Sequence, residues 1–107
     1  MEKVRFQFSK KGLLSYISHL DLMRLFMRAA RRANFTLSLS QGFSPHPRLS
    51  IKKAQKLGKE LQAEEAYLIL EEGLEFKEFK RRFEDQLPLE IRIEKIPEVK
   101  DEQRNPD

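Results

Sequence analysis

The chain has 107 residues, of which 39% are hydrophobic and 36% are charged, so it can build one modest core but not the cores of two domains. It has no cysteine, which excludes disulfides, thiolate metal sites, iron–sulfur clusters and a cysteine nucleophile, and which fits a reduced cytoplasmic setting. No segment has the length and apolarity of a membrane span, and the first residues lack the pattern of a signal peptide, so we expect a cytoplasmic protein without membrane contact.

The net charge of +4 conceals a difference between the two halves of the chain. In residues 1–53, eleven lysine and arginine residues stand against two acids, whereas in residues 54–107 ten stand against fifteen. A basic half of this kind attracts a polyanion or an acidic protein face, and it can equally pair with the acidic half of its own fold.

The first predicted elements are a strand and a helix. Apolar and polar residues alternate over residues 3–9, which is the period of a half-buried strand. Over residues 18–33 the apolar side chains fill one broad arc and arginines occupy the other side, which predicts an amphipathic helix. Ser18 can cap its first turn, Asp21 suits the positive end of the helix dipole, and Asn34 is a plausible end.

Shorter elements are predicted in the middle of the chain. Residues 36–40 alternate and predict a second strand, which Gly42 and two prolines interrupt. Alternation restarts at residues 49–51, where the chain can fold back as a hairpin. Residues 52–65 are polar and are expected to form a loop.

The last elements are a strand, a helix and a strand. The apolar run at residues 66–70 has the length of a strand covered on at least one face. Three phenylalanines at helical spacing predict a second amphipathic helix over residues 75–86. Residues 89–93 alternate as a final strand, and residues 97–107 are expected to be a flexible polar tail.

This order predicts a ferredoxin-like α+β fold, βαββαβ, with an extra hairpin allowed after the second strand. Two helices would cover one face of an antiparallel sheet, and residues 1–96 would form a single domain. Because one helical layer covers one face, the other face is left for solvent, a partner or a further domain.

An arginine stripe lies on the first predicted helix. Arg24, Arg28 and Arg31 fall within one narrow sector, and Arg32 lies beside it. Forked guanidinium donors suit phosphate oxygens, and each phosphate contact adds salt-dependent affinity. The alternative is an ordinary solvated face of a surface helix.

The segment Gly42-Phe43-Ser44-Pro45-His46-Pro47-Arg48 follows the second predicted strand. Prolines on both sides of His46 restrict the backbone, so the loop should be stiff. It would display His46 and Arg48, and Phe43 could stack on a nucleic-acid base. The alternative is a hairpin tip whose prolines prevent edge pairing, with Phe43 tucked into the core.

The two histidines, His19 and His46, are weak candidates for catalysis. Together they could act as acid and base in RNA cleavage, or bind a metal with Asp21. Against a catalytic or metal-binding role, the residues from Ser18 to Asp21 are already explained by their position at the start of a helix. The sequence has no phosphate-binding loop, nucleophile elbow, paired-histidine zinc motif or RNA-recognition-motif signature, so we expect no metal, no cofactor and no conventional enzyme.

Two motifs, residues 18–24 and residues 40–48, with Arg31-Arg32-Ala33 between them, resemble the bacterial radical-SAM-linked protein family, whose function is uncharacterised. The resemblance extends over about residues 3 to 95. It implies fusion to, or encoding beside, radical-SAM proteins, and in some cases beside ribonucleases, and hence an accessory role in RNA modification or processing. Members usually continue into a second half, which the uncovered sheet face would meet, and residues 51–56 are more basic here than in the family.

We therefore expect an RNA-binding accessory module whose ligand is RNA, such as tRNA or rRNA. One alternative is a protein-interaction module that docks a radical-SAM partner; another is a metal-independent RNA-processing enzyme using His19 and His46. The expected nucleic-acid contacts are Arg24, Arg28, Arg31, Arg32, Phe43, His46, Arg48, Lys52 and Lys53.

Overall fold

The computed structural model describes residues 1–52, 55–56 and 62–96. Its elements in chain order are β1 (Glu2–Lys10), a short 3-10 helix η1 (Gly12–Tyr16), α1 (His19–Arg32), β2 (Leu49–Ile51), β3 (Gln55–Lys56), β4 (Gln62–Leu70), α2 (Phe76–Glu84) and β5 (Ile91–Glu94). The predicted tail, residues 97–107, lies outside the described residues. Within the described parts, no helix combines the length and apolarity needed to cross a membrane.

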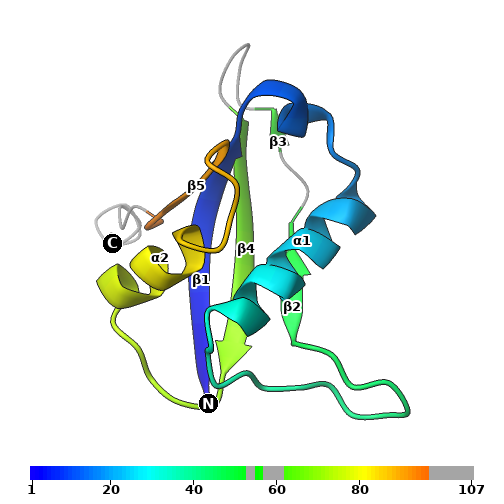
Figure 1. The fold of residues 1–107 in the computed structure, drawn as a ribbon, viewed down its shortest axis with the longest axis vertical. Helices are drawn as coiled ribbons and strands as arrows, with labels where there is room; N and C mark the ends of the chain where they lie inside the picture. The colour runs from blue at the N-terminus through cyan, green and yellow to red at the C-terminus, as the bar shows by residue number, and fades with distance from the viewer. Residues whose placement is uncertain (53–54, 57–61, 97–107) are drawn as a thin grey trace, which may run out of the picture.

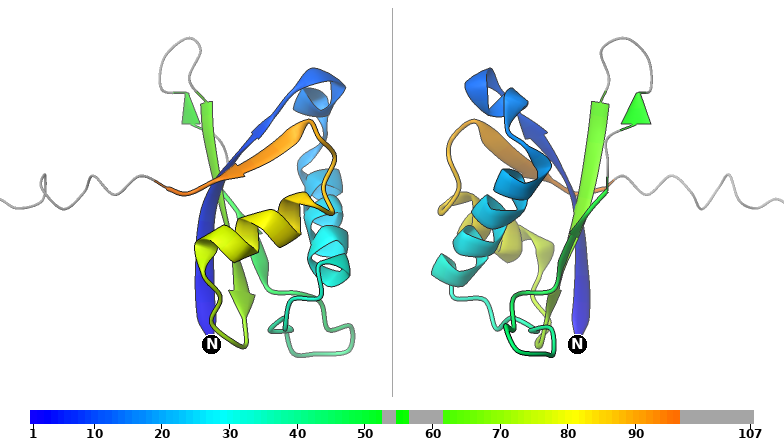
Figure 2. Two further views of the ribbon diagram at one scale, coloured as in Figure 1. Left: turned by 60° about the vertical axis from the view of Figure 1, so that its left-hand side comes forward. Right: turned by 90° about the vertical axis from the view of Figure 1, so that its right-hand side faces the viewer.

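The strands form an antiparallel sheet of order β2-β4-β1-β5, with β3 pairing β4 off this path. Both helices lie against the same face of the sheet (Figures 1 and 2). The chain is therefore a small mixed α+β domain, and its arrangement is compatible with the predicted ferredoxin-like one.

An aromatic core lies between the sheet and the helices. Phe6 of β1 contacts Phe26 of α1 at 5.9 Å and Phe83 of α2 at 5.7 Å between ring centroids, both edge to face. Phe79 completes the cluster, and all four rings are fully buried. Edge-to-face pairs of this kind add to the free energy gained by burying the rings. The predicted inner faces of the first strand and of both helices are thus confirmed.

The start and the end of α1 follow the predicted chemistry. The Ser18 hydroxyl accepts a hydrogen bond from the Asp21 amide at 3.1 Å, which satisfies one free donor of the first turn. Asn34 adopts a left-handed φ of 63°, the conformation in which helices commonly end.

The predicted strand over residues 36–40 is wrong as a continuous element. Ser38 donates its amide to Ile69 of β4, but the chain then leaves the sheet and returns where the Arg48 amide donates to the Ser38 carbonyl. Isolated bridges join Leu37 to Leu70 and Leu39 to Pro47. Proline has no amide to donate to a ladder, so residues 40–46 form a loop inserted in the edge strand, and β2 continues that edge beside β4.

The predicted loop over residues 52–65 is also wrong, because β4 begins at Gln62 and β3 covers Gln55–Lys56. Pairing with β1 extends β4 through Glu64 and Glu65, and the Lys10 ammonium lies 3.0 Å from the Glu64 carboxylate, with both side chains only 15% exposed. Tertiary pairing here overrides the low strand propensity of polar residues.

Candidate nucleic-acid interface

The face of the sheet opposite the helices is uncovered by any described element (Figure 2). Side chains alternate along each strand, so β1 presents Lys3 and Arg5 on this face while Phe6 points inward. The register places Arg5 opposite Tyr67 of β4, and Tyr67 opposite Ser50 of β2. An aromatic ring on the central strand is therefore flanked by cations of a neighbouring strand.

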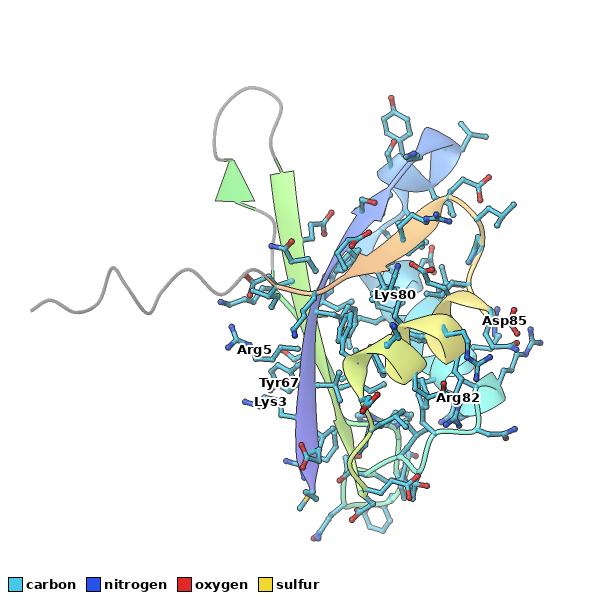
Figure 3. All side chains as sticks on the ribbon, turned by 90° about the vertical axis from the view of Figure 1, so that its left-hand side faces the viewer. Lys3, Arg5, Tyr67, Lys80, Arg82 and Asp85 are labelled. Carbon is cyan, nitrogen blue, oxygen red and sulfur yellow. The ribbon has the colours of Figure 1, made fainter. Side chains whose placement is uncertain are left out.

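Lys3 and Tyr67 form a cation–π contact on this face. The Lys3 ammonium lies 4.4 Å from the centroid of the Tyr67 ring, within cation–π range. Figure 3 shows Lys3, Arg5 and Tyr67 projecting together on the side away from both helices. A half-buried ring held by its strand is a preorganised stacking platform, and the ammonium beside it is available to a phosphate.

A shallow hollow of about 230 Å³ surrounds this pair. Among the described residues that line it, Glu65 is the one acid, and its carboxylate lies 3.7 Å from the Arg5 guanidinium and 3.9 Å from the Lys52 ammonium. Exposed pairs at such distances are weak, so the cations keep most of their attraction for an external anion. The lining residues that carry this argument are Lys3, Arg5, Ser50, Lys52, Glu65 and Tyr67.

Arg48 extends the cationic face toward the inserted loop. Its carbonyl accepts from the Ile69 amide, which puts it on the same side of the edge strand as Ser50 and Lys52. Within the described part of the chain, the contacts of its guanidinium are long, 3.5 Å to the Ser38 hydroxyl and 3.7 Å to the Met1 sulfur. Of the predicted contacts, Arg48 and Lys52 thus both lie on the uncovered face, and Lys53 lies outside the described residues.

We call residues 40–46 the inserted loop; its two ends are fastened to each other. The Ser40 amide donates to the His46 carbonyl at 2.8 Å, and the His46 amide donates to the Ser40 hydroxyl at 3.2 Å. Gly42 has a φ of 126°, which favours glycine, and Phe43 at the tip is 107% exposed relative to its reference state. The alternative that Phe43 is tucked into the core is therefore wrong.

The four arginines of the predicted stripe are exposed on the outer side of α1, and its buried side faces the sheet. Arg24 lies 3.6 Å from the Asp21 carboxylate. Arg28 and Arg32 line a groove of about 380 Å³ together with Asp85, at the end of α2. The stripe is consequently separate from the uncovered sheet face; Arg24 has an acidic contact, and Asp85 lines the same groove as Arg28 and Arg32.

The two histidines lie at opposite ends of α1. His19 is the first residue of the helix, and His46 belongs to the inserted loop that follows its other end (Figure 1). A helix of 14 residues is about 20 Å long, and both side chains are exposed. A mechanism that needs both imidazoles on one reacting group finds no support in this arrangement. No group of three metal-ligating side chains converges within the described residues.

Sequence reasoning missed Lys3, Arg5 and Tyr67 as site residues. Alternation over residues 3–9 already placed Arg5 on the polar side of its strand, and the expectation of a single helical layer left that side uncovered. Tyr67 was missed because it stands in an apolar run, in which the sequence does not distinguish the two faces of the strand. The strand register shows that its ring points outward.

A family model described as "uncharacterized protein conserved in bacteria (DUF2344)" matches residues 3–106. No curated protein and no solved structure matches the chain.

Proposed function

We propose that this chain, which belongs to the bacterial family DUF2344, is an RNA-binding accessory module whose ligand contacts the uncovered sheet face. The observation that carries the proposal is the Lys3 ammonium placed over the Tyr67 ring in the middle of a cationic surface. A ferredoxin-like sheet open on one face would serve as the scaffold.

The ligand chemistry follows from the ring and the cations. Every base has a face that can stack on an aromatic side chain, and stacking contributes about 1–3 kcal/mol per base. Bases are free to stack on a protein where RNA is single-stranded, while phosphates there meet lysine and arginine. Tyr67 would take a base, and Lys3, Arg5, Arg48 and Lys52 would take the phosphates around it. Single-stranded parts of tRNA or rRNA fit this surface.

The inserted loop and α1 would act as auxiliary contacts. Phe43 offers a second exposed ring on the inserted loop, whose ends join the β2 edge, and His46 lies on the same loop. The arginines Arg24, Arg28, Arg31 and Arg32 would meet a more distant part of a large RNA. We assign them a smaller share, because Asp21 and Asp85 offset part of their charge and no exposed aromatic ring of α1 accompanies them.

The setting would be RNA modification or processing beside a radical-SAM protein in the cytoplasm. This part of the proposal is supported by the resemblance of residues 18–24 and 40–48 to radical-SAM-linked proteins.

A protein-docking function is the second candidate, and a different surface favours it. Leu13, Tyr16 and Leu89 are each at least 84% exposed. The Lys11 amide donates to the Glu90 carbonyl at 3.0 Å, which holds the segments carrying these side chains next to each other. Exposed apolar side chains gathered in this way are typical of a contact with another protein, and a radical-SAM partner would be docked here.

A binding titration tests the proposal. Fluorescence anisotropy with a labelled single-stranded RNA of about 12 nucleotides, and with tRNA, at low and moderate salt should give saturable, salt-dependent binding. Tyr67→Ala should weaken binding by about 5- to 150-fold, which corresponds to about 1–3 kcal/mol, and Tyr67→Phe should retain it because the ring remains.

The control is Arg24→Ala combined with Arg28→Ala, which removes two cations from α1, on the other side of the molecule, and leaves the residues of the sheet face in place. We expect a loss of less than about threefold for the single strand. An unrelated acidic protein serves as the competitor for non-specific charge attraction. If Tyr67→Ala binds RNA as the original chain does, or if the acidic protein competes fully, the proposal is wrong.

A further inference from the structure

The sheet has two edges, which differ in how far side chains of other elements cover their backbone groups. On β5, the backbone amide and carbonyl of Ile93 face away from β1 and are hydrogen-bonded to side chains of α2. The Ile93 amide donates to the Glu84 carboxylate at 2.7 Å, and the Lys80 ammonium donates to the Ile93 carbonyl at 2.8 Å. A strand cannot add there without displacing these bonds.

The β2 edge has no such cover among the described residues. The Ile69 amide donates to the Arg48 carbonyl at 3.1 Å, and the Lys52 amide donates to Glu65 at 2.8 Å. In an antiparallel pair alternate residues turn toward the partner, so Arg48, Ser50 and Lys52 face β4, and the backbone groups of Leu49 and Ile51 point away from the sheet. Two amides and two carbonyls are thus left for another strand.

We infer that the β2 edge accepts an extended acidic segment of a partner protein as an added strand. Main-chain bonds to Leu49 and Ile51 would supply affinity, and alternate side chains would supply specificity. Leu49 and Ile51 are half-buried and point to the helix side, so the added strand needs apolar residues there. Arg48 and Lys52 lie on the other side, and Lys52 is 74% exposed, so acids belong opposite them.

Charge also decides against a second copy of this chain. Two identical edges pair antiparallel about a two-fold axis, so pairing centred on Ser50 would place Arg48 of one copy opposite Lys52 of the other. Like charges directly opposite each other in a sheet are destabilising. An acidic partner strand meets both cations favourably.

The probe for the experiment is a blocked peptide of about seven residues that alternates valine and glutamate, with the valine–lysine peptide as its matched control. Titration of the full chain, followed by NMR, should saturate with the acidic peptide only. Hydrogen exchange of the Leu49 and Ile51 amides should slow by about tenfold or more at saturation, because both amides become donors to the added strand.

Ile51→Pro is the discriminating variant, because it removes an outward amide while the amides that face β4 remain. Peptide affinity should fall by about tenfold or more with circular dichroism unchanged. Should this variant fail to fold, Lys52→Glu replaces it and should weaken the acidic peptide while allowing the basic one to bind.

Equal binding of both peptides, unchanged affinity in the folded variant, or a dimer formed through this edge in sedimentation equilibrium would each overturn the inference. The inference does not rest on RNA binding, since Ile51→Pro removes no cation or ring of the sheet face. An RNA titration of the same variant therefore tests the two proposals separately.

Discussion

At the scale of single residues, Arg82 fastens α2 to the end of α1. Its guanidinium donates to the Ala33 carbonyl at 3.2 and 2.7 Å and to the Asn34 carbonyl at 2.9 Å, and it lies 5.0 Å from the centroid of the Phe35 ring. The last carbonyls of a helix lack partners within the helix, and a planar fork can satisfy two of them at once. Figure 3 shows Arg82 on the helix side of the sheet.

Arg82→Ala should lower the free energy of unfolding by about 2 kcal/mol, because charged hydrogen bonds contribute about 1.5–3 kcal/mol. Arg82→Lys should recover part of the loss, since an ammonium reaches fewer carbonyls. Urea denaturation followed by circular dichroism measures both variants. A loss below about 0.5 kcal/mol for Arg82→Ala, the usual range for surface substitutions, would contradict this role.

Arg82 also marks a limit of sequence reasoning at this scale. It stands in the run Lys80-Arg81-Arg82, where the sequence offers no distinction between a solvated cation and a structural one. The α1–α2 packing makes the difference, because it brings Arg82 to carbonyls 48 and 49 positions earlier in the chain. Tyr67 was missed for the same reason, since the strand register decides where its ring points.

At the scale of elements, α2 is joined to β5 by Glu84. Burial raises the pKa of Glu84, but hydrogen bonds from the Ile93 amide and the Lys80 ammonium offset this and hold the pKa below its ordinary value of 4.5. Because the pKa is lower in the folded chain than in the unfolded chain, Glu84 stabilises the fold fully above pH 4.5, and this contribution is lost as the pH falls through the folded value.

Glu84→Gln should flatten the pH dependence of stability below about pH 4.5, because the amide still accepts from Ile93 but no longer titrates. Thermal midpoints between about pH 6 and pH 3 measure this. Glu78 also has a lowered pKa, through its hydrogen bond with Arg81, so Glu78→Gln is the matched control on the same helix. If the two variants and the original chain lose stability in parallel below pH 4.5, Glu84 does not contribute in this way.

Elements with their own periodicity could be predicted, and elements made by pairing could not. The first strand and both amphipathic helices follow from side-chain spacing alone, with ends shifted by a few residues. The prediction of a continuous edge strand at residues 36–40 was wrong because prolines force the chain out of the ladder. The predicted β4 was too short because its polar residues Glu64 and Glu65 pair with β1.

At the scale of the whole molecule, the sheet interleaves the basic and acidic halves of the chain. The basic half supplies β1 and β2, and the acidic half supplies β4, which lies between them. Part of the basic excess is therefore neutralised internally, as in the Lys10 and Glu64 pair. Other cations of the basic half lie on the uncovered sheet face, as Lys3 and Arg5 do beside Tyr67, or on α1.

The distribution of these cations over two surfaces explains how far the candidate site could be predicted. Composition indicated a basic surface, and the motifs indicated that α1 and the inserted loop contribute to it. A single basic patch was expected, whereas the fold has two, one on the uncovered sheet face and one on the outer side of α1. Arg48 and Lys52 lie on the same sheet face as Tyr67 only because the edge strand resumes after the inserted loop. RNA binding by either surface stays a prediction.

The most direct test of the account is NMR mapping of backbone amides during titration with the single-stranded RNA used above. We predict that the largest shift changes fall on β1, β2 and β4 around Lys3, Ser50 and Tyr67, with smaller ones in the inserted loop. Changes confined to α1, from Arg24 to Arg32, or no change at saturating RNA, would contradict the sheet face as the binding surface.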